Sequence, residues 1–147
     1  MWGFVHPRSG RTEWLITTTV SGAGTSAALR AFADEVGAGP DRRIVLVIDG
    51  AGWHTAPEVV VPDGIHLIVQ PPYSPELQPA ERLWPLLRES LANRDFVDID
   101  EHRDVTARRC LELAAQPDVI RARTLMHWWP QDHVPKVAEP APERAAS

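Results

Sequence analysis

The sequence has little that would stabilise a secreted protein or anchor one in a membrane. Its 147 residues include a single cysteine, Cys110, so no disulfide can form within the chain. There is no apolar run near the roughly 20 residues of a membrane-spanning helix, and no charged-then-apolar leader follows Met1. These absences predict a soluble, cytoplasmic protein with no membrane partner.

Positive charge is also scarce. The 15 Lys and Arg residues are outnumbered by 20 Asp and Glu residues, which gives a formal net charge of −5. Because phosphate contacts come mainly from Lys and Arg, this balance argues against a protein that holds nucleic acid chiefly through a large basic surface. A zinc site is disfavoured too, since no zinc-motif spacing relates His102, Cys110, His127 and His133.

The remaining composition suits one globular domain. With 44% hydrophobic residues, the chain is long enough for a single core and too short for a catalytic domain plus a separate DNA-reading domain. Residues 130–147 are rich in Pro, Ala and charge, and such a tail buries too little surface to offset its ordering entropy. We therefore expect one domain over 1–129 and a disordered tail over 130–147.

The first third of the chain predicts a β-hairpin followed by a helix. Strands are expected over 2–6 and 12–20, on either side of the turn sequence Pro-Arg-Ser-Gly. The helix is expected to be capped by Ser26 and to end at Gly37 in a left-handed conformation. Its apolar stripe consists of Leu29, Phe32, Ala33 and Val36.

Two apolar runs then predict strands. Residues 44–48 are unbroken Ile, Val and Leu, the pattern of a strand covered on both faces. Asp49 follows directly, so a carboxylate is expected at the carboxyl end of a buried strand. Residues 65–69 predict a second buried strand.

The segment after the second strand predicts a loop and three helices. The loop over 70–78 is rich in proline, and Pro79 suits the first turn of a helix that holds Glu81. Pro85 is expected to kink this helix. The residues of this helix that are expected to point inward are Leu83, Trp84, Leu87 and Leu91. A second helix is expected to be capped by Asp98 with Glu101, and its inward residues are expected to be Ala107, Cys110, Leu111 and Ala114. A last helix is expected from about 118 to 128.

The strings VLVIDGAGWHT and QPPYSPELQPAERLW carry the strongest functional signal. They closely resemble the second and third catalytic blocks of bacterial insertion-sequence transposases in the Tc/mariner superfamily, which commonly read strand-Asp-Asn-x-x-x-His and PPYSPxLNPIExxW. The hairpin sequence WGFVHPRSGRTEWLI looks like that family's second and third strands. The resemblance covers the chain to about Trp129. It implies an α/β ribonuclease H-like fold, a mixed sheet flanked by helices, and metal-dependent DNA cleavage and strand transfer.

The resemblance assigns two of the three metal-binding carboxylates of a DDE transposase. Asp49 matches the second and Glu81 the third, and His54 is an auxiliary candidate. The first carboxylate normally ends the central strand just before the hairpin, and neither it nor the family's helix-turn-helix region has a counterpart after Met1. Gly50 and Gln78 stand where the family blocks commonly have Asn.

The implied chemistry explains the residue types. Phosphodiester cleavage needs a metal-activated nucleophile and a second metal on the leaving oxygen, and hard cations such as Mg²⁺ or Mn²⁺ prefer carboxylate oxygens. Two ions about 3.5–4 Å apart need one carboxylate that bridges them and one further carboxylate for each ion, which makes three acids. We expect Asp49 and Glu81 to face one concave surface, with their oxygens about 4–8 Å apart.

Each candidate also has a structural alternative. Asp49 before Gly50 is typical of an Asx turn, and Glu81 in a first helical turn is favoured by the helix dipole. His54 either orients an acid or a scissile phosphate, or makes a structural hydrogen bond. Tyr73 and Trp84 are expected to pack in the core or against a loop. Arg82 and Arg88 are expected to lie on a solvated helix face.

Three functional hypotheses remain. The chain is a transposase segment, acting on transposon-end and target DNA as a homodimer, that works once an upstream polypeptide supplies the first Asp and the helix-turn-helix region. Alternatively, it is a decayed remnant without activity, because a missing central strand leaves two open sheet edges. A ribonuclease H-like nuclease unrelated to transposition ranks last, since it would not be expected to carry PPYSPELQPAERLW.

Overall fold

A computed structural model describes residues 1–17 and 19–127 as a mixed α/β structure. The tail predicted to be disordered over 130–147 lies outside the described residues. No helix in the described ranges is long and apolar enough to cross a membrane. The elements, in chain order, are β1 (Trp2–His6), β2 (Arg11–Leu15), α1 (Gly22–Val36), β3 (Ile44–Ile48), β4 (Ile65–Val69), the 3₁₀ turns η1 (Pro75–Leu77) and η2 (Pro79–Arg82), α2 (Leu83–Glu89), α3 (Ile99–Ala114) and α4 (Pro117–Thr124).

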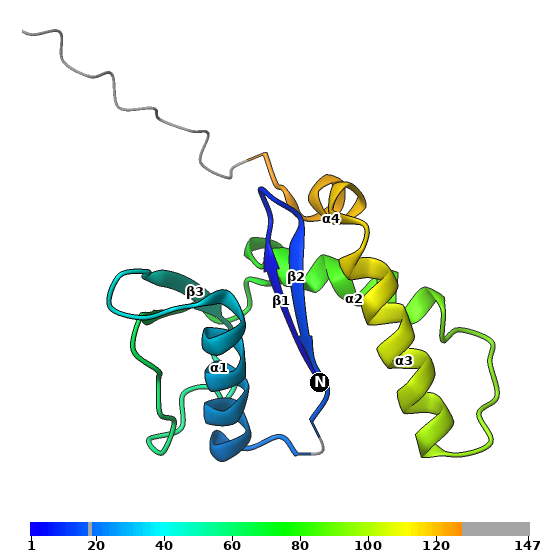
Figure 1. The fold of residues 1–147 in the computed structure, drawn as a ribbon, viewed down its shortest axis with the longest axis horizontal. Coiled ribbons are helices and arrows are strands. Elements are labelled where there is room, and N and C mark those ends of the chain that lie inside the picture. Colours follow the sequence, from blue (N-terminus) through cyan, green and yellow to red (C-terminus); the bar gives the residue numbers. More distant parts are fainter. Residues whose placement is uncertain (18, 128–147) are drawn as a thin grey trace, which may run out of the picture.

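The β1–β2 hairpin forms the centre of the molecule, with α1 and β3 on one side and α2, α3 and α4 on the other (Figure 1). Side chains alternate across a strand, so the two faces of the hairpin meet different helices. On one face Phe4 stacks on Phe32 of α1, with ring centroids 4.2 Å apart. On the other, Val5 and Trp14 pack against the helices that follow. The second strand ends at Leu15, earlier than the expected residue 20, because pairing with β1 stops there.

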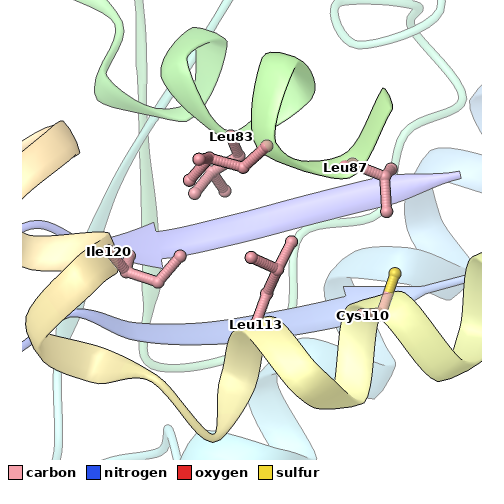
Figure 2. Close-up of a cluster of buried hydrophobic side chains, with 6 residues drawn as sticks. Leu83, Leu87, Cys110, Leu113 and Ile120 are labelled. Atoms are coloured by element: carbon pink, nitrogen blue, oxygen red, sulfur yellow. The ribbon is translucent and has the colours of Figure 1, made fainter. Parts of the chain in front are cut away.

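The main hydrophobic core lies between the hairpin and the three C-terminal helices. Figure 2 shows Leu83 and Leu87 of α2 pointing toward Cys110 and Leu113 of α3 and Ile120 of α4. Each of these side chains is at most 4% exposed. Burial of this kind contributes roughly 1.5–3 kcal/mol per large aliphatic side chain. The core therefore fixes α2, and with it the turn η2 that precedes α2.

The second sheet is a parallel pair, β3 with β4, in the register Ile44 with Ile65 to Ile48 with Val69. Both predicted strands have the expected bounds, but the prediction of cover on both faces is wrong. Val45 is 62% exposed and Ile68 is 53% exposed, whereas Ile48 on the opposite face is 7% exposed. The two sheets share no strand pairing within the described ranges, so each remains two-stranded. The face of β3–β4 that carries Val45 and Ile68 is exposed to solvent.

The ends of α1 are set by a serine and a glycine. Gly37 takes φ 67°, which confirms the predicted left-handed cap. The predicted N-cap was wrong by five residues, since Ser21 Oγ accepts from Gly24 N at 3.1 Å and Ser26 lies inside the helix. Ser26 instead accepts from Val60 N at 2.9 Å. The cap at Ser21 satisfies a free amide and lets a glycine-rich first turn become helical.

The prediction placed Pro85 in the second turn of a helix that starts at Pro79, and that placement is wrong, because the α-helix starts later than the sequence suggests. Residues 79–82 form the 3₁₀ turn η2, and α2 begins at Leu83. Pro85 is therefore the third residue of α2, within the first turn, where its missing N–H breaks no intrahelical hydrogen bond. Glu81 accordingly sits in a 3₁₀ turn just ahead of the helix.

The predicted cap of α3 is confirmed, and its predicted apolar stripe is partly wrong. Glu101 N donates to the Asp98 carboxylate at 2.8 Å. Cys110 is buried as expected, but Leu111 is 73% exposed while Leu113 is 1% exposed. The helix meets α2 and α4 together, which rotates its buried face toward Leu113. The last helix, α4, ends at Thr124, before the predicted limit near residue 128.

The contrast within α3 gives a matched test of the fold. We expect Leu113→Ala to lower the free energy of unfolding by about 2–5 kcal/mol, because it opens a cavity in the core. Leu111→Ala should change it by no more than about 0.5 kcal/mol, since that side chain is mostly in solvent. Urea titration followed by circular dichroism measures both. Equal effects would contradict the orientation of α3.

The core cysteine provides a second test. Burial raises the pKa of the Cys110 thiol from 9.0 to about 11. Thiolate is the reactive form, so at pH 8 the folded chain should react with iodoacetamide about 100-fold more slowly than the unfolded chain, from the two-unit pKa difference. Because burial favours the neutral thiol, Cys110 contributes to the free energy of unfolding while it is protonated, and this contribution is lost as the pH rises from 9 towards 11. Equal rates with and without denaturant would contradict the core position of Cys110.

Candidate active site

Asp49 lies at the carboxyl end of β3, as predicted, and its side chain is held in one orientation. Its Oδ1 accepts hydrogen bonds from Ala51 N at 3.0 Å and from His54 Nδ1 at 2.6 Å. The bond to Ala51 is the Asx-type contact that the sequence also suggested. The carboxylate is nevertheless 47% exposed. Asp49 is therefore fixed through one oxygen while remaining accessible to a ligand.

His54 is held against the start of the chain as well as against Asp49. Its side chain is 13% exposed, and its ring lies 4.8 Å from the Trp2 ring and 5.8 Å from the Trp53 ring, between centroids. Thr25 Oγ1 of α1 donates to Trp53 O at 2.6 Å. The bond between His54 and Asp49 fits both predicted roles, an orienting contact with an acid and a structural hydrogen bond.

Glu81 occupies the first turn after the proline-rich loop. Its backbone N donates to Gln78 O at 3.1 Å, and its side chain is exposed. No ion pair engages Glu81 within the described ranges. Pro79 is buried beneath this turn, and α2 follows directly into the core. The acid is therefore anchored through its backbone and free at its carboxylate.

The loop between the two acids is bonded to both of their elements. Gln70 N donates to Ile48 O at 2.8 Å, one residue before Asp49. The turn η1 near the end of the loop packs on η2, which carries Glu81. A shared surface for the two carboxylates, with their oxygens about 4–8 Å apart, remains a prediction from metal coordination geometry.

Trp84 and Tyr73 differ in their surroundings. Trp84 packs against the core and meets Trp14 edge-on at 6.1 Å between ring centroids, so its predicted packing role is confirmed. The same prediction for Tyr73 is wrong, because its side chain is 99% exposed. The prolines around Tyr73 were the available signal, since a stiff loop can hold a ring away from the protein.

The two arginines near Glu81 have ordinary surface positions. Arg82 is exposed and donates from Nη1 to Arg123 O at 3.4 Å, which ties η2 to the end of α4. Arg88 is exposed on α2. Both observations agree with the solvated helix face expected for these residues.

The donor chemistry fits a hard divalent cation only in part. Asp49 and Glu81 offer accessible carboxylate oxygens, the ligands that such ions prefer. Within 1–17 and 19–127, however, no group of three or more His, Cys, Asp or Glu side chains is placed to hold a metal ion. The described residues thus supply fewer ligands than a two-metal site requires.

Comparison with known proteins gives the family. Residues 1–103 match the model of the DDE superfamily endonuclease, a stretch that includes Asp49, His54 and Glu81. The chain is also 35% identical over 134 residues to the uncharacterized protein y4pE/y4sA of Sinorhizobium fredii (strain NBRC 101917 / NGR234), which covers 87% of this chain and 94% of that protein. No solved structure matches. The chain belongs to the DDE superfamily of endonucleases.

Proposed function

We propose that the chain is the C-terminal part of the catalytic domain of a Tc/mariner-type transposase of an insertion sequence, which cleaves and joins DNA. The observation that carries this proposal is the family match over 1–103, because it contains both acid-bearing blocks. The accessible carboxylates of Asp49 and Glu81 support it. The substrates are transposon-end DNA and target DNA, and the working enzyme is a homodimer that pairs two DNA ends.

In this proposal Asp49 and Glu81 are the metal ligands and catalytic residues. Mg²⁺ or Mn²⁺, when bound, activates the attacking water and stabilises the leaving oxygen. Asp49 has one oxygen held by Ala51 and His54, which leaves Oδ2 for an ion. Glu81 is free at both oxygens within the described part of the chain. The protein's contribution is to hold the Asp49 carboxylate in one orientation and to present the Glu81 carboxylate from a turn held by its backbone.

A further polypeptide supplies the third carboxylate in this proposal. β1 pairs only with β2, and β3 only with β4, within the described ranges. The start of β1 and the loop after β3 meet, because the Trp2 ring lies 4.8 Å from the His54 ring. A central strand between β1 and β3 would join the two pairs into one ribonuclease H-like sheet. Such a strand, ending in Asp, and a helix-turn-helix region are expected from the upstream polypeptide.

One feature favours the second candidate, an inactive remnant, for the chain by itself. Open strand edges and the exposed apolar face around Val45 and Ile68 promote mispairing with other chains. The two candidates make the same prediction for the isolated chain. They differ once the missing segment is supplied.

The test of the proposed function is a fusion enzyme. The segment that carries the first strand and the helix-turn-helix region is taken from the DNA upstream of Met1, or from an active relative, and joined ahead of Met1. We expect this fusion to nick transposon-end DNA with Mg²⁺ or Mn²⁺ and to lose activity with EDTA. A folded fusion that binds the DNA ends and never nicks them would favour the remnant.

His54 gives a separate prediction in the fusion enzyme. His54→Ala should lower the nicking rate about 10- to 100-fold, as expected when a group that orients a metal ligand is removed. The control is His66→Ala, because His66 is exposed on β4 and contacts Arg43 instead. Single-turnover nicking on end DNA measures both variants. A full rate after His54→Ala would show that Asp49 needs no such support.

A further inference from the structure

Tyr73 is placed in a way that neither packing nor the proposed metal chemistry explains. Its side chain is 99% exposed, although an aromatic ring ordinarily gains much from burial. Its backbone takes φ 60°, in the left-handed region that a bulky residue rarely adopts. Both the ring and the backbone are therefore held in unfavourable states. Strained positions of this kind cluster at sites that contact ligands.

The surrounding loop is built to hold Tyr73 outward. Gln70 is 7% exposed, and its Nε2 donates to Ser74 O, so the chain on the two sides of Tyr73 is tied together. Ser74 Oγ donates to Pro72 O at 3.4 Å, and Leu77 N donates to Ser74 O at 3.1 Å. The prolines in this loop fix their own φ angles. The ring is thus presented to solvent on a stiff support.

The loop also places Tyr73 beside the candidate active site. Gln70 N is bonded to Ile48 O, next to Asp49. Three residues of chain reach at most about 11 Å, which limits the distance from Gln70 to Tyr73. On the other side, η1 packs on η2, which carries Glu81. Tyr73 therefore lies in the short loop that connects the neighbour of the Asp49 strand to the turn that carries Glu81.

We propose that Tyr73 is a nucleobase-binding residue whose ring stacks on an unpaired base of the DNA strand held at the Asp49 and Glu81 site. This inference rests on the proposed function. Aromatic stacking suits any base and needs no charge. A chain of net charge −5 has little electrostatic attraction for phosphate, so uncharged contacts gain importance. A loop whose backbone is held before binding also loses less entropy when its ring stacks.

The experiment uses the chain itself and its single tyrosine. Because Tyr73 is the only Tyr among the 147 residues, 3-fluorotyrosine labelling gives one ¹⁹F resonance. The labelled chain is titrated at low salt with a ten-nucleotide single strand of dT and with an abasic strand of equal length. We expect the dT strand to shift the resonance to saturation and the abasic strand to leave it nearly unchanged.

Variants measure the size of the contact. Tyr73→Ala should weaken binding of the dT strand about 5- to 150-fold in fluorescence anisotropy, the range for losing one stacked base. Tyr73→Phe should bind like the parent, because it keeps the ring. Tyr73→Gly should bind as weakly as Tyr73→Ala and raise the melting temperature, since glycine accepts φ 60° without strain. A melting temperature lowered by Tyr73→Ala would mean that the ring is structural, and would overturn the proposal.

Other outcomes also overturn the proposal. The ¹⁹F resonance of Tyr73 could stay unmoved when the dT strand is bound, or shift equally with the dT strand and the abasic strand. The dT strand could also fail to bind up to millimolar concentration. Finally, the resonance could shift when the chain alone is diluted. The last outcome would indicate that the ring contacts a second protein copy instead. Failure of the proposed function looks different, because a fusion enzyme without nicking activity leaves the stacking of dT on Tyr73 intact. Conversely, a fusion enzyme with Tyr73→Ala that nicks and binds DNA like the parent would refute the stacking proposal and leave the proposed function standing.

Discussion

The isolated chain is expected to show no metal-dependent nicking or strand transfer on transposon-end DNA. The physical reason is the ligand count, because no cluster of three metal-binding side chains exists within the described ranges and two-metal chemistry needs three acids. Removal of a supporting residue alone costs about 10- to 100-fold at metal sites. A missing direct ligand should therefore cost more than about 100-fold. The assay uses supercoiled DNA with Mg²⁺ and, separately, with Mn²⁺.

The decisive control for this expectation is Asp49→Ala. Trace nicking that is equal in the parent chain and in Asp49→Ala comes from a contaminating nuclease and leaves the expectation standing. Robust turnover by the isolated chain, abolished by Asp49→Ala, would contradict it. The third acid would then come from this chain or from a second copy.

In the fusion enzyme, Asp49→Asn and Glu81→Gln are each expected to reduce cleavage to below about 1% of the parent rate. The reason is that loss of a residue that only supports a metal ligand costs about 10- to 100-fold, and loss of the ligand itself should cost more. Both substitutions keep the size of the side chain and remove the charge that a cation needs. Asp49→Asn keeps an oxygen able to accept from Ala51 N, and Glu81 is exposed. The melting temperature should therefore change little in either variant.

Glu76→Gln is the matched control for these substitutions. Glu76 is an exposed carboxylate in η1, five residues before Glu81, so its loss changes the net charge equally in the same region. We expect it to cleave at close to the parent rate. Near-normal cleavage by Asp49→Asn or Glu81→Gln would show that the wrong acids have been assigned.

The strands that carry and support the acid site were predictable because their signals are local. Residues 44–48 are an unbroken apolar run, residues 65–69 are apolar except for His66, both are rich in β-branched residues, and both strands have the predicted bounds. The position of Asp49 follows from the first run. The Gly37 cap and the Asp98 cap were also predictable, since each depends on a residue type with one strong conformational preference.

The predictions that proved wrong share a different cause, because the burial of a side chain depends on elements that are distant in the chain. The exposure of Val45 and the rotation of α3 toward Leu113 depend on which elements pack together, and a run of residue types does not contain that information. The outward position of Tyr73 depends on the buried amide of Gln70 bonding to Ser74 O. Glutamine in a proline-rich loop gives no sign of that bond.

The most direct test of a shared metal site at Asp49 and Glu81 is the structure of the fusion enzyme with Mn²⁺, located by anomalous scattering. We predict one Mn²⁺ on Asp49 Oδ2 and one on the Glu81 carboxylate, about 3.5–4 Å apart. Asp49 Oδ1 should keep its bond to His54 Nδ1. Carboxylates on opposite faces of the domain, or Mn²⁺ bound at neither acid, would contradict the account.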